Sequence, residues 1–409
     1  MPRILRILNR LIIGGPSRNA VYLSRYLQPE FETLLVTGGK EDHEQDAEEL
    51  ATENGIIPYS IPEMKREISF KDDWISYKKI KKLIREFRPD IVHTHAAKSG
   101  ALGRLAARHC GVPVIIHTFH GHVFHSYFGP AKTNFFIRAE RYLAKFTDRM
   151  IAISEKQKTE LASQFRIAPA DKFHIIPLGL HLDPFTENQQ EKRDRFRKEF
   201  QLKEDEIAVG IIGRLVPVKN HAMFINVMQR IFLQGGVKMK AFIIGDGESK
   251  EMIKQMAVEK GISFCAEGEN KYEKPLIFTS WRTDIDVICA GMDIICLTSL
   301  NEGTPVSLIE AQAAAKPIVA TRVGGVEDVV IENKTALLTD AGNDFQFSEH
   351  LIRLAASASL RGEMGQQGRD FVLSRFGYIR LVADMRNLYY NLLENKNSNG
   401  RHSKLLEKE

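Results

Sequence analysis

Residues 299–325 read SLNEGTPVSLIEAQAAAKPIVATRVGG, and they contain two glutamates, Glu302 and Glu310, that are separated by seven residues. Glu302 falls in a loop between two apolar runs, whereas Glu310 lies inside an otherwise apolar helical pattern. We expect this helix to begin with Thr304 as its cap and Pro305 in its first position. The free backbone amides after Gly303 would then suit a phosphate group at the end of the preceding strand.

The two carboxylates suit the hydroxyls of a sugar or a ribose, because ionised carboxylates accept hydrogen bonds. Glu302 and Glu310 do not have the i+3 or i+4 spacing of neighbours on one helix, so we expect them to contact different parts of an extended ligand. A pair of carboxylates for acid–base hydrolysis is the alternative. The nearby phosphate-binding turn favours a nucleotide ligand.

Short β-branched runs alternate with helical patterns along the whole chain, which predicts an α/β fold with parallel sheets and helices on both faces. The strands expected in the first half are 3–8, 33–38, 90–95, 113–118, 150–154 and 174–179. Those expected in the second half are 208–213, 241–247, 276–281, 294–299, 317–321 and 336–340.

This alternation stops at residues 181–205, which are polar and charged, and then resumes. A chain of 409 residues is also too long for one core of roughly 150 residues. We therefore predict two doubly wound, Rossmann-like domains facing a cleft, at 1–180 and 206–376, joined by a linker at 181–205. A helix at 377–396 and a polar, frayed tail at 397–409 complete the prediction. Ligands of such sheets bind beyond the carboxyl ends of the strands.

The composition, with 43% hydrophobic and 27% charged residues, is that of a globular enzyme and excludes disordered and collagen-like chains. No apolar run reaches the ~18 residues of a membrane span. The N-terminal MPRILRILNRLIIGGPS lacks a small-residue cleavage site, so we interpret it as a first strand and not as a signal peptide. The four cysteines lack CxxC spacing and are expected to be buried thiols of a cytoplasmic protein.

The net charge of +5 comes from an excess of Lys and Arg within residues 1–180. Much of this excess lies in YKKIKKLIREFR, residues 77–88, whose apolar residues recur at helical spacing. Two interpretations stay open, a solvated helix face and a basic surface for anionic lipid head groups. We expect no nucleic-acid partner, because no aromatic–basic interleaving or zinc module accompanies the charge.

Two further loops suit phosphate groups. In GIIGRLVPVKN, residues 210–220, Arg214 and Lys219 follow a strand that ends at Gly213. The planar guanidinium of Arg and the compact ammonium of Lys together suit a diphosphate without a metal. In LIIGGPSRNAVYL, residues 11–23, Gly14 and Gly15 separate a strand from a helix. Paired glycines let the backbone approach a ligand, although a plain tight turn has the same pattern.

Histidines gather at the ends of two neighbouring strands. HTFHGHVFH, residues 117–125, contains His117, His120, His122 and His125, and His93 and His95 end the previous strand. A zinc cluster would need a cysteine or carboxylate at familiar spacing, which is missing here. The pattern favours one neutral imidazole that hydrogen-bonds a substrate.

Together these motifs resemble the family-4 retaining glycosyltransferases, whose architecture of two Rossmann domains is called GT-B. The resemblance rests on the two spaced glutamates, on GRLVPVKN (213–220), on GDGE (245–248) and on IEAQAAAKPIVATRVGGVEDVV (309–330). IGGP (13–16), HTHAAKSGALGRLAA (93–107) and HTFHGH (117–122) resemble members that act on lipid-linked acceptors in cell-surface polysaccharide assembly.

The resemblance implies a hexosyl or N-acetylhexosaminyl transferase that uses a nucleotide-diphosphate sugar and a hydroxyl of a glycan or lipid-linked acceptor, in polysaccharide or lipopolysaccharide synthesis. Glu310 would hold the ribose, and Glu302 and His120 the donor sugar. Arg214 and Lys219 would neutralise the diphosphate. Backbone groups at Gly14 and Gly15, and at Gly303, Thr304, Pro305 and Val306, would add to donor binding.

The family pattern also implies a mechanism. The acceptor hydroxyl would attack from the front face, and the departing phosphate would take its proton. Cationic side chains would replace a divalent metal, so neither metal nor cofactor is expected. The last helix would cross back to the N-terminal domain and couple closure of the cleft, and the enzyme would lie on the inner face of the cytoplasmic membrane.

This sequence departs from the family pattern at Ala315, where glycine is more frequent, and in having no acidic residue after Gly14 and Gly15. The nucleotide base is left unassigned. A nucleotide-sugar 2-epimerase of the same fold and a non-catalytic nucleotide-sugar-binding partner are the alternative functions.

Overall fold

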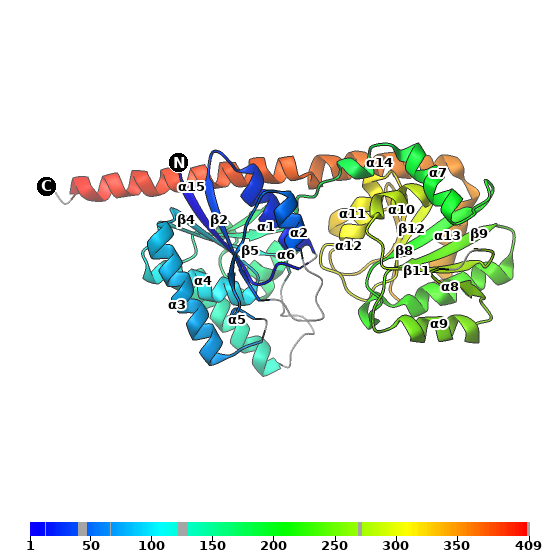
Figure 1. Cartoon of the computed structure of the whole chain (residues 1–409), viewed down its shortest axis with the longest axis horizontal. Coiled ribbons are helices and arrows are strands. Elements are labelled where there is room, and N and C mark those ends of the chain that lie inside the picture. Colours follow the sequence, from blue (N-terminus) through cyan, green and yellow to red (C-terminus); the bar gives the residue numbers. More distant parts are fainter. Residues whose placement is uncertain (13, 40–46, 66, 122–129, 269–271, 407–409) are drawn as a thin grey trace. The chain divides into compact units, whose positions relative to one another are not determined.

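The computed structural model describes residues 1–12, 14–39, 47–65, 67–121, 130–268 and 272–406. The chain forms two compact units, the first made of Met1–Leu180 with Phe376–Glu409 and the second of His181–Arg375 (Figure 1). Each unit contains a seven-stranded sheet whose strand pairs are parallel. The predicted α/β class with two doubly wound domains is therefore confirmed.

The first sheet has the order β3-β2-β1-β4-β5-β6-β7. Its strands are β1 (Arg3–Leu8), β2 (Glu32–Gly38), β3 (Tyr59–Ile61), β4 (Ile91–His95), β5 (Val114–Phe119), β6 (Arg149–Ala152) and β7 (Phe173–Ile175). All but β3 match predicted strands within a few residues. Strand β3 escaped prediction because it has three residues, of which Tyr59 and Ser60 are exposed, and so carries little buried-strand signal.

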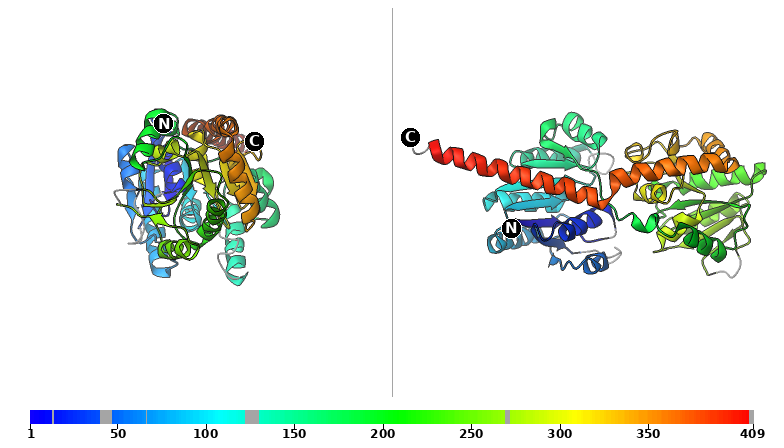
Figure 2. Two further views of the ribbon diagram at one scale, coloured as in Figure 1. Left: turned by 90° about the vertical axis from the view of Figure 1, so that its right-hand side faces the viewer. Right: turned by 90° about the horizontal axis from the view of Figure 1, so that it is seen from above.

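Successive side chains of a strand point to opposite faces of the sheet, and here both sets include apolar residues. Helices therefore cover both faces. On one face, Ile4, Ile91, Val114 and Ile116 pack against α1 (Gly15–Tyr26) and α15 (Tyr378–Leu406). On the other face, Leu5, Ile7, Val92 and Ile115 pack against α3 (Phe70–Phe87) and α4 (Ala97–His109). The C-terminal helix thus belongs to the first unit, as predicted, and runs along it in red in Figure 2.

The remaining elements of the first unit are short or peripheral. They are α2 (Glu48–Glu53), α5 (Pro130–Ala144), α6 (Glu155–Thr159), a π-helical turn (Glu160–Gln164) and a 3₁₀ turn (Ala170–Lys172). The basic segment 77–88 lies in α3, which begins earlier than predicted because the Ser69 hydroxyl caps the amide of Asp72.

The second sheet has the order β10-β11-β9-β8-β12-β13-β14. Its strands are β8 (Ile207–Ile212), β9 (Met239–Ile244), β10 (Phe264–Cys265), β11 (Leu276–Ser280), β12 (Ile294–Leu297), β13 (Ile318–Thr321) and β14 (Ala336–Thr339). Its helices are α8 (His221–Gln234), α9 (Lys250–Glu259), α10 (Ile285–Gly291), α11 (Val306–Ala313), α12 (Val326–Val329), α13 (Asp344–Ala356) and α14 (Ala358–Phe376), with 3₁₀ turns at Asp183–Phe185 and Pro217–Lys219. Only the two-residue edge strand β10 was not predicted.

The segment predicted as a linker, 181–205, instead contains helix α7 (Gln189–Glu199), which belongs to the second unit. Phe196 is fully buried, and its ring packs so closely on Gly291 that a Cβ added there would lie 2.2 Å from Cδ1. Arg193 on the same helix pairs with Asp293 at 2.7 Å. The predicted frayed tail, 397–409, is also corrected, because α15 continues through it to Leu406.

We predict that Phe196→Ala lowers the free energy of unfolding of the second unit by about 3–5 kcal/mol, because a buried aromatic ring leaves a cavity. Urea denaturation of both proteins measures the change. Lys198→Ala is the matched control, since Lys198 is exposed on the same helix, and we expect it to stay within about 0.5 kcal/mol of wild type. Equal stability of both variants would mean that 181–205 is a linker after all.

Candidate active site

The candidate site residues lie where the chain order of each sheet reverses. In the first sheet the chain leaves β1 toward β2 on one side, and β4 pairs with β1 on the other. In the second sheet β9 and β12 flank β8 in the same way. The connections after the two central strands diverge there, and open α/β sheets bind their ligands at such a point of the carboxyl edge. Gly14 and Arg214 follow β1 and β8, and His120 and Glu302 follow β5 and β12.

In the second unit, Lys219 and Glu302 contact each other. The Lys219 ammonium lies 2.6 Å from Oε1 of Glu302, and the Ser299 hydroxyl donates to the same oxygen at 2.6 Å. Their side chains are 22% and 10% exposed, so the pair is partly screened from water. A cation and a carboxylate are thus held side by side, each within reach of a ligand at this edge.

Backbone contacts hold the two loops that carry this pair. The amide of Leu300 donates to the carbonyl of Val218 at 2.8 Å, and the Thr298 hydroxyl donates to the carbonyls of Lys219 and Asn220. Gly324 comes so close to the Glu302 loop that a Cβ would lie 1.9 Å from the Glu302 carbonyl oxygen. A side chain at Gly324 would therefore displace Glu302.

Other predicted residues of the second unit lie as follows. Arg214 is exposed, and its guanidinium makes no hydrogen bond or ion pair with any residue that the structure describes, whereas its carbonyl accepts from the amide of Val216 at 3.0 Å. Glu310 is 7% exposed on α11. The predicted helix start is corrected by one residue: α11 begins at Val306, Pro305 occupies the cap position, and no side chain caps the helix. Thr304 and Gly303 lie in the preceding loop, because Pro305 has an extended ψ of 96°.

In the first unit, Gly14 has extended backbone at the cap position of α1, and Gly15 is its first residue. A Cβ at Gly15 would lie 3.2 Å from Cδ1 of Leu178, so this position tolerates only a small side chain. No side chain caps α1, and its first turn holds no acidic residue. The first amides of the helix therefore have no carboxylate competing for them.

Two hydrogen-bonded pairs of polar side chains lie on one face of the first sheet, and Arg6 joins them by bonding His93 and His95. His93 and His95 alternate with Thr94 on β4, and so share a face that also holds Thr118 and His120. Nε2 of His93 lies 2.7 Å from the Thr118 hydroxyl, and Nδ1 of His95 lies 2.9 Å from Nε2 of His120. The predicted residue His120 is thus part of a network and not a lone side chain.

Burial lowers the pKa of these histidines. For His120 the loss of hydration lowers the pKa to about 3. For His93 and His95 burial is again the largest cause, and the positive charge of Arg6 adds to it. These lowered pKa values favour the neutral form of all three rings at physiological pH.

The other histidines of the motif do not join this network. His117 points to the opposite face, where its Nδ1 lies 2.8 Å from the Thr94 hydroxyl and its ring packs on Gly100. His122 and His125 lie outside the described residues. Within the described ranges, no group of three His, Cys, Asp or Glu side chains is arranged to hold a metal ion.

Three residues of the site were missed in the sequence. Arg6 bonds His93 and His95, Tyr389 of α15 bonds Arg6 and His93, and Ser299 holds Glu302. Arg6 did leave a signal, because a charged residue in the middle of a central parallel strand breaks the apolar pattern of such strands. Tyr389 left none, since tyrosine is ordinary in a half-buried helix.

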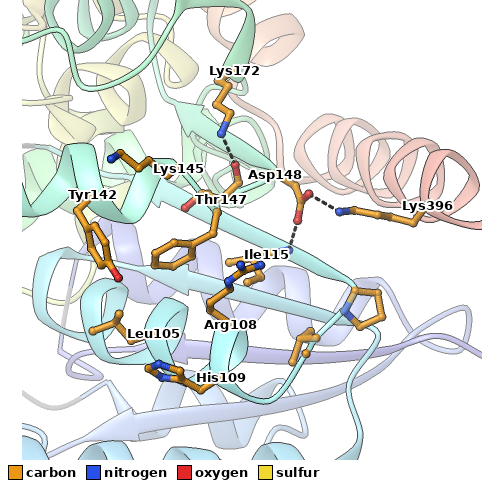
Figure 3. A pocket seen from close by; sticks show the side chains of 14 residues that line it. Leu105, Arg108, His109, Ile115, Tyr142, Lys145, Thr147, Asp148, Lys172 and Lys396 are labelled. Carbon is orange, nitrogen blue, oxygen red and sulfur yellow. Dashed lines mark hydrogen bonds and ion pairs between the residues drawn. The ribbon is translucent and has the colours of Figure 1, made fainter. Parts of the chain in front are cut away.

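The first unit also has a hollow of about 790 Å³, but it lies elsewhere (Figure 3). Its lining includes Pro113 and Asp148, which precede β5 and β6, so it lies at the amino edge of the sheet. Asp148 is held there by Lys396 of α15 at 2.8 Å and by the amide of Ile115 at 2.8 Å. This hollow is therefore not part of the candidate site at the carboxyl edge.

Comparison with known proteins shows the family of the chain. Residues 13–184 match the model of Glycosyltransferase Family 4, and residues 192–371 match that of Glycosyl transferases group 1. The chain is 28% identical to the UDP-Gal:alpha-D-GlcNAc-diphosphoundecaprenol alpha-1,3-galactosyltransferase of Escherichia coli, with 84% of this chain and 86% of that protein covered. It is 25% identical to the capsular polysaccharide biosynthesis glycosyltransferase CapM of Staphylococcus aureus, with 85% and 89% covered.

The fold also matches solved structures. The structure of Anabaena Alr3699/HepE in complex with UDP superposes with a TM-score of 0.79 and 17% identity, covering 95% of this chain and all of that one. At this identity the likeness establishes the fold alone. Among the described residues, none of the helices has the length and apolarity needed to cross a bilayer.

We predict that the free energy of unfolding falls as the pH decreases below about 6.5, the pKa of an unperturbed histidine. Between that value and the pKa of about 3 for His120, the unfolded chain binds a proton that the folded chain does not, so acid favours unfolding. His120→Gln should reduce this slope by up to about 1.4 kcal/mol per pH unit. Urea denaturation between pH 5 and 7.5 measures it.

The matched control is His174→Gln, because His174 is an exposed histidine of the same unit and burial is the cause under test. If His120→Gln keeps the wild-type slope, the ring of His120 is not buried in the folded protein.

Proposed function

The chain belongs to the family-4 glycosyltransferases, and from this premise we propose that it moves a hexosyl or N-acetylhexosaminyl group from a uridine-diphosphate sugar to a sugar hydroxyl on a polyprenyl-diphosphate acceptor. Transfer retains the anomeric configuration. The observation that carries the proposal is the contact between Lys219 and Glu302 at the carboxyl edge of the second sheet. The names of the E. coli relative and of the Anabaena complex support the uridine nucleotide, and the former supports the lipid-linked acceptor.

The contact explains how donor binding would proceed. Lys219 already lies beside Glu302, so a diphosphate needs only to draw the ammonium partly away from the carboxylate. Ser299 continues to hold Oε1, which keeps Glu302 in place to accept hydrogen bonds from sugar hydroxyls. Arg214 is exposed in the same loop as Lys219, and its guanidinium can donate two parallel hydrogen bonds to phosphate oxygens. Glu310 on α11 is assigned to the ribose.

Charge develops on the leaving diphosphate as the glycosidic bond breaks. Two cations beside the diphosphate stabilise it more in the transition state than in the ground state, and this difference accelerates the reaction. The acceptor hydroxyl attacks from the side of the leaving group, and a phosphate oxygen takes its proton. In this proposal Arg214 and Lys219 do the work of a divalent metal, and His120 orients the donor sugar.

A transfer assay tests the proposal. The protein is incubated with UDP-galactose, UDP-glucose or UDP-N-acetylglucosamine and an N-acetylglucosaminyl-diphosphate lipid, with EDTA present, while released UDP is measured. We expect UDP release that depends on the acceptor, and an α-linked product by NMR. Loss of donor without acceptor would indicate an epimerase or a hydrolase, and no turnover of any pair would contradict the proposal.

A variant ties this assay to the site. Lys219→Met should lower kcat/KM roughly 10- to 100-fold, because a hydrogen bond to a charged group contributes about 1.5–3 kcal/mol. Lys238→Met is the matched control, since Lys238 pairs with Asp205 before the start of β9 and so lies at the other edge of the sheet.

We also propose that α3 contacts an anionic membrane surface, where a lipid-linked acceptor would be found. Phe70 and Trp74, near the start of this helix, are 93% and 57% exposed. Lys78, Lys82 and Arg85 are exposed on the same helix, and Lys78 lies over the Trp74 ring. Aromatic and basic side chains together are typical of helices that lie in a lipid interface. Lys79 is not counted, because it pairs with Glu63 at 2.7 Å and is only partly exposed. Lys82 pairs with Glu86 at 3.7 Å, but its side chain stays 76% exposed.

Replacing Lys78, Lys82 and Arg85 with Gln should weaken binding to phosphatidylglycerol vesicles, by roughly 1 kcal/mol for each charge. Co-sedimentation with vesicles measures the affinity. The control replaces Lys198, Lys203 and Lys260, three exposed lysines of the second unit, so that the net charge changes equally. If the two triple variants bind alike, the α3 face is simply solvated.

A further inference from the structure

Arg6 is a fully buried cation at the centre of the first sheet, and the side chains that bond it are neutral. Its Nη1 lies 2.9 Å from Nδ1 of His93 and 3.3 Å from Nε2 of His95, and its Nη2 lies 3.2 Å from the Tyr389 hydroxyl. No carboxylate forms an ion pair with Arg6 within the described part of the chain. A guanidinium only donates hydrogen bonds, so each of these partners must accept.

This requirement determines which nitrogen of each histidine carries the proton. His93 accepts at Nδ1, so its proton is on Nε2 and is donated to the Thr118 hydroxyl at 2.7 Å. His95 accepts at Nε2, so its proton is on Nδ1 and is donated to Nε2 of His120 at 2.9 Å. Tyr389 accepts from Arg6, and its hydroxyl lies 2.6 Å from Nδ1 of His93, so Tyr389 and Arg6 share the single lone pair of that nitrogen as donors. All these proton positions follow from Arg6, whose guanidinium can donate hydrogen bonds but cannot accept them.

The last ring in the chain is His120. Because its Nε2 accepts from His95, a neutral His120 carries its proton on Nδ1. A charged His120 would also carry a proton on Nε2, and that N–H would face the Nδ1–H of His95 at 2.9 Å with no acceptor between them. Nδ1 of His120 is buried and has no hydrogen-bond partner among the described residues. A buried donor without an acceptor is costly, unless a ligand supplies the acceptor.

We propose that Arg6 is a positioning residue that acts through His95 to fix His120 as the Nδ1–H tautomer, so that His120 donates a hydrogen bond to an oxygen of the bound substrate. Only the identity of that oxygen, on the transferred sugar, rests on the proposed function. Tyr389 brings α15 into the same arrangement by holding Arg6 and His93. Without Arg6, the proton of His95 can move from Nδ1 to Nε2. His120 can then carry its own proton on Nε2 and donate it to Nδ1 of His95.

Long-range ¹H–¹⁵N correlation spectra of the full-length protein with ¹⁵N-labelled histidine test this arrangement, since protonated and unprotonated ring nitrogens resonate far apart. The signal that is absent in His120→Gln identifies His120. We expect the Nδ1–H pattern in the wild-type protein and its loss in Arg6→Met. A wild-type Nε2–H pattern would overturn the proposal, and so would an unchanged pattern in Arg6→Met. The wild-type spectrum decides even where Arg6→Met does not fold.

Tyr389→Phe is the matched variant, because it removes a hydroxyl that also bonds Arg6 but leaves the contact between Arg6 and His95. It should keep the Nδ1–H pattern of His120, and loss of the pattern there would assign the effect to packing. In the transfer assay, Arg6→Met should lower kcat about tenfold while leaving the KM for the donor nearly unchanged, as expected for one lost hydrogen bond to the reacting sugar. The spectra need no turnover, so a failed transfer assay and a failed tautomer assignment are separate results.

Discussion

Parallel pairing is the constraint on which the arrangement of this protein depends. Parallel strands end at one edge of their sheet. The connections after β1, β4 and β5 therefore emerge at one edge of the first sheet, and those after β8 and β12 at one edge of the second. Parallel pairing alone therefore brings glycine-rich turns and polar side chains that are far apart in the chain to the same edge. Lys219 and Glu302, 83 positions apart, meet at 2.6 Å for this reason.

The period of two along each strand then sorts side chains between core and site. On the face covered by α1 and α15, Ile4 precedes Arg6 on β1, and Ile91 precedes His93 and His95 on β4. On β4 this stripe thus changes from apolar to polar as it approaches the carboxyl edge, whereas on β1 the apolar Leu8 follows Arg6. The terminal nitrogens of the buried Arg6 guanidinium donate to His93, His95 and Tyr389, whereas its Nε is buried without a partner among the described residues. Burial and the positive charge of Arg6 lower the pKa of His93 and His95, so these rings resist protonation.

The sequence predicted the sheets well and the contacts between loops poorly. Long apolar strands such as β1 and β9 were found from their pattern, whereas β3 and β10 are too short to show one. Helix α7 was taken for a linker because a single residue of it, Phe196, is buried beneath a charged exterior. Glu302 and Lys219 were both identified, but not their contact. That contact depends on how the Gly324 turn and the bond between Leu300 and Val218 place two loops, which residue spacing does not encode.

The position of α15 in the chain has a consequence for synthesis. The second unit is continuous, whereas the first is completed only by the last helix, which covers Ile4, Ile116 and Arg6. A ribosome adds about 5–20 residues per second, so the roughly 200 residues between Leu180 and Tyr389 take on the order of 10–40 s. During that interval the half that is made first has a sheet face that α1 covers but α15 does not yet cover. The second unit can fold before the first is finished, and the nascent chain presents a surface that chaperones recognise.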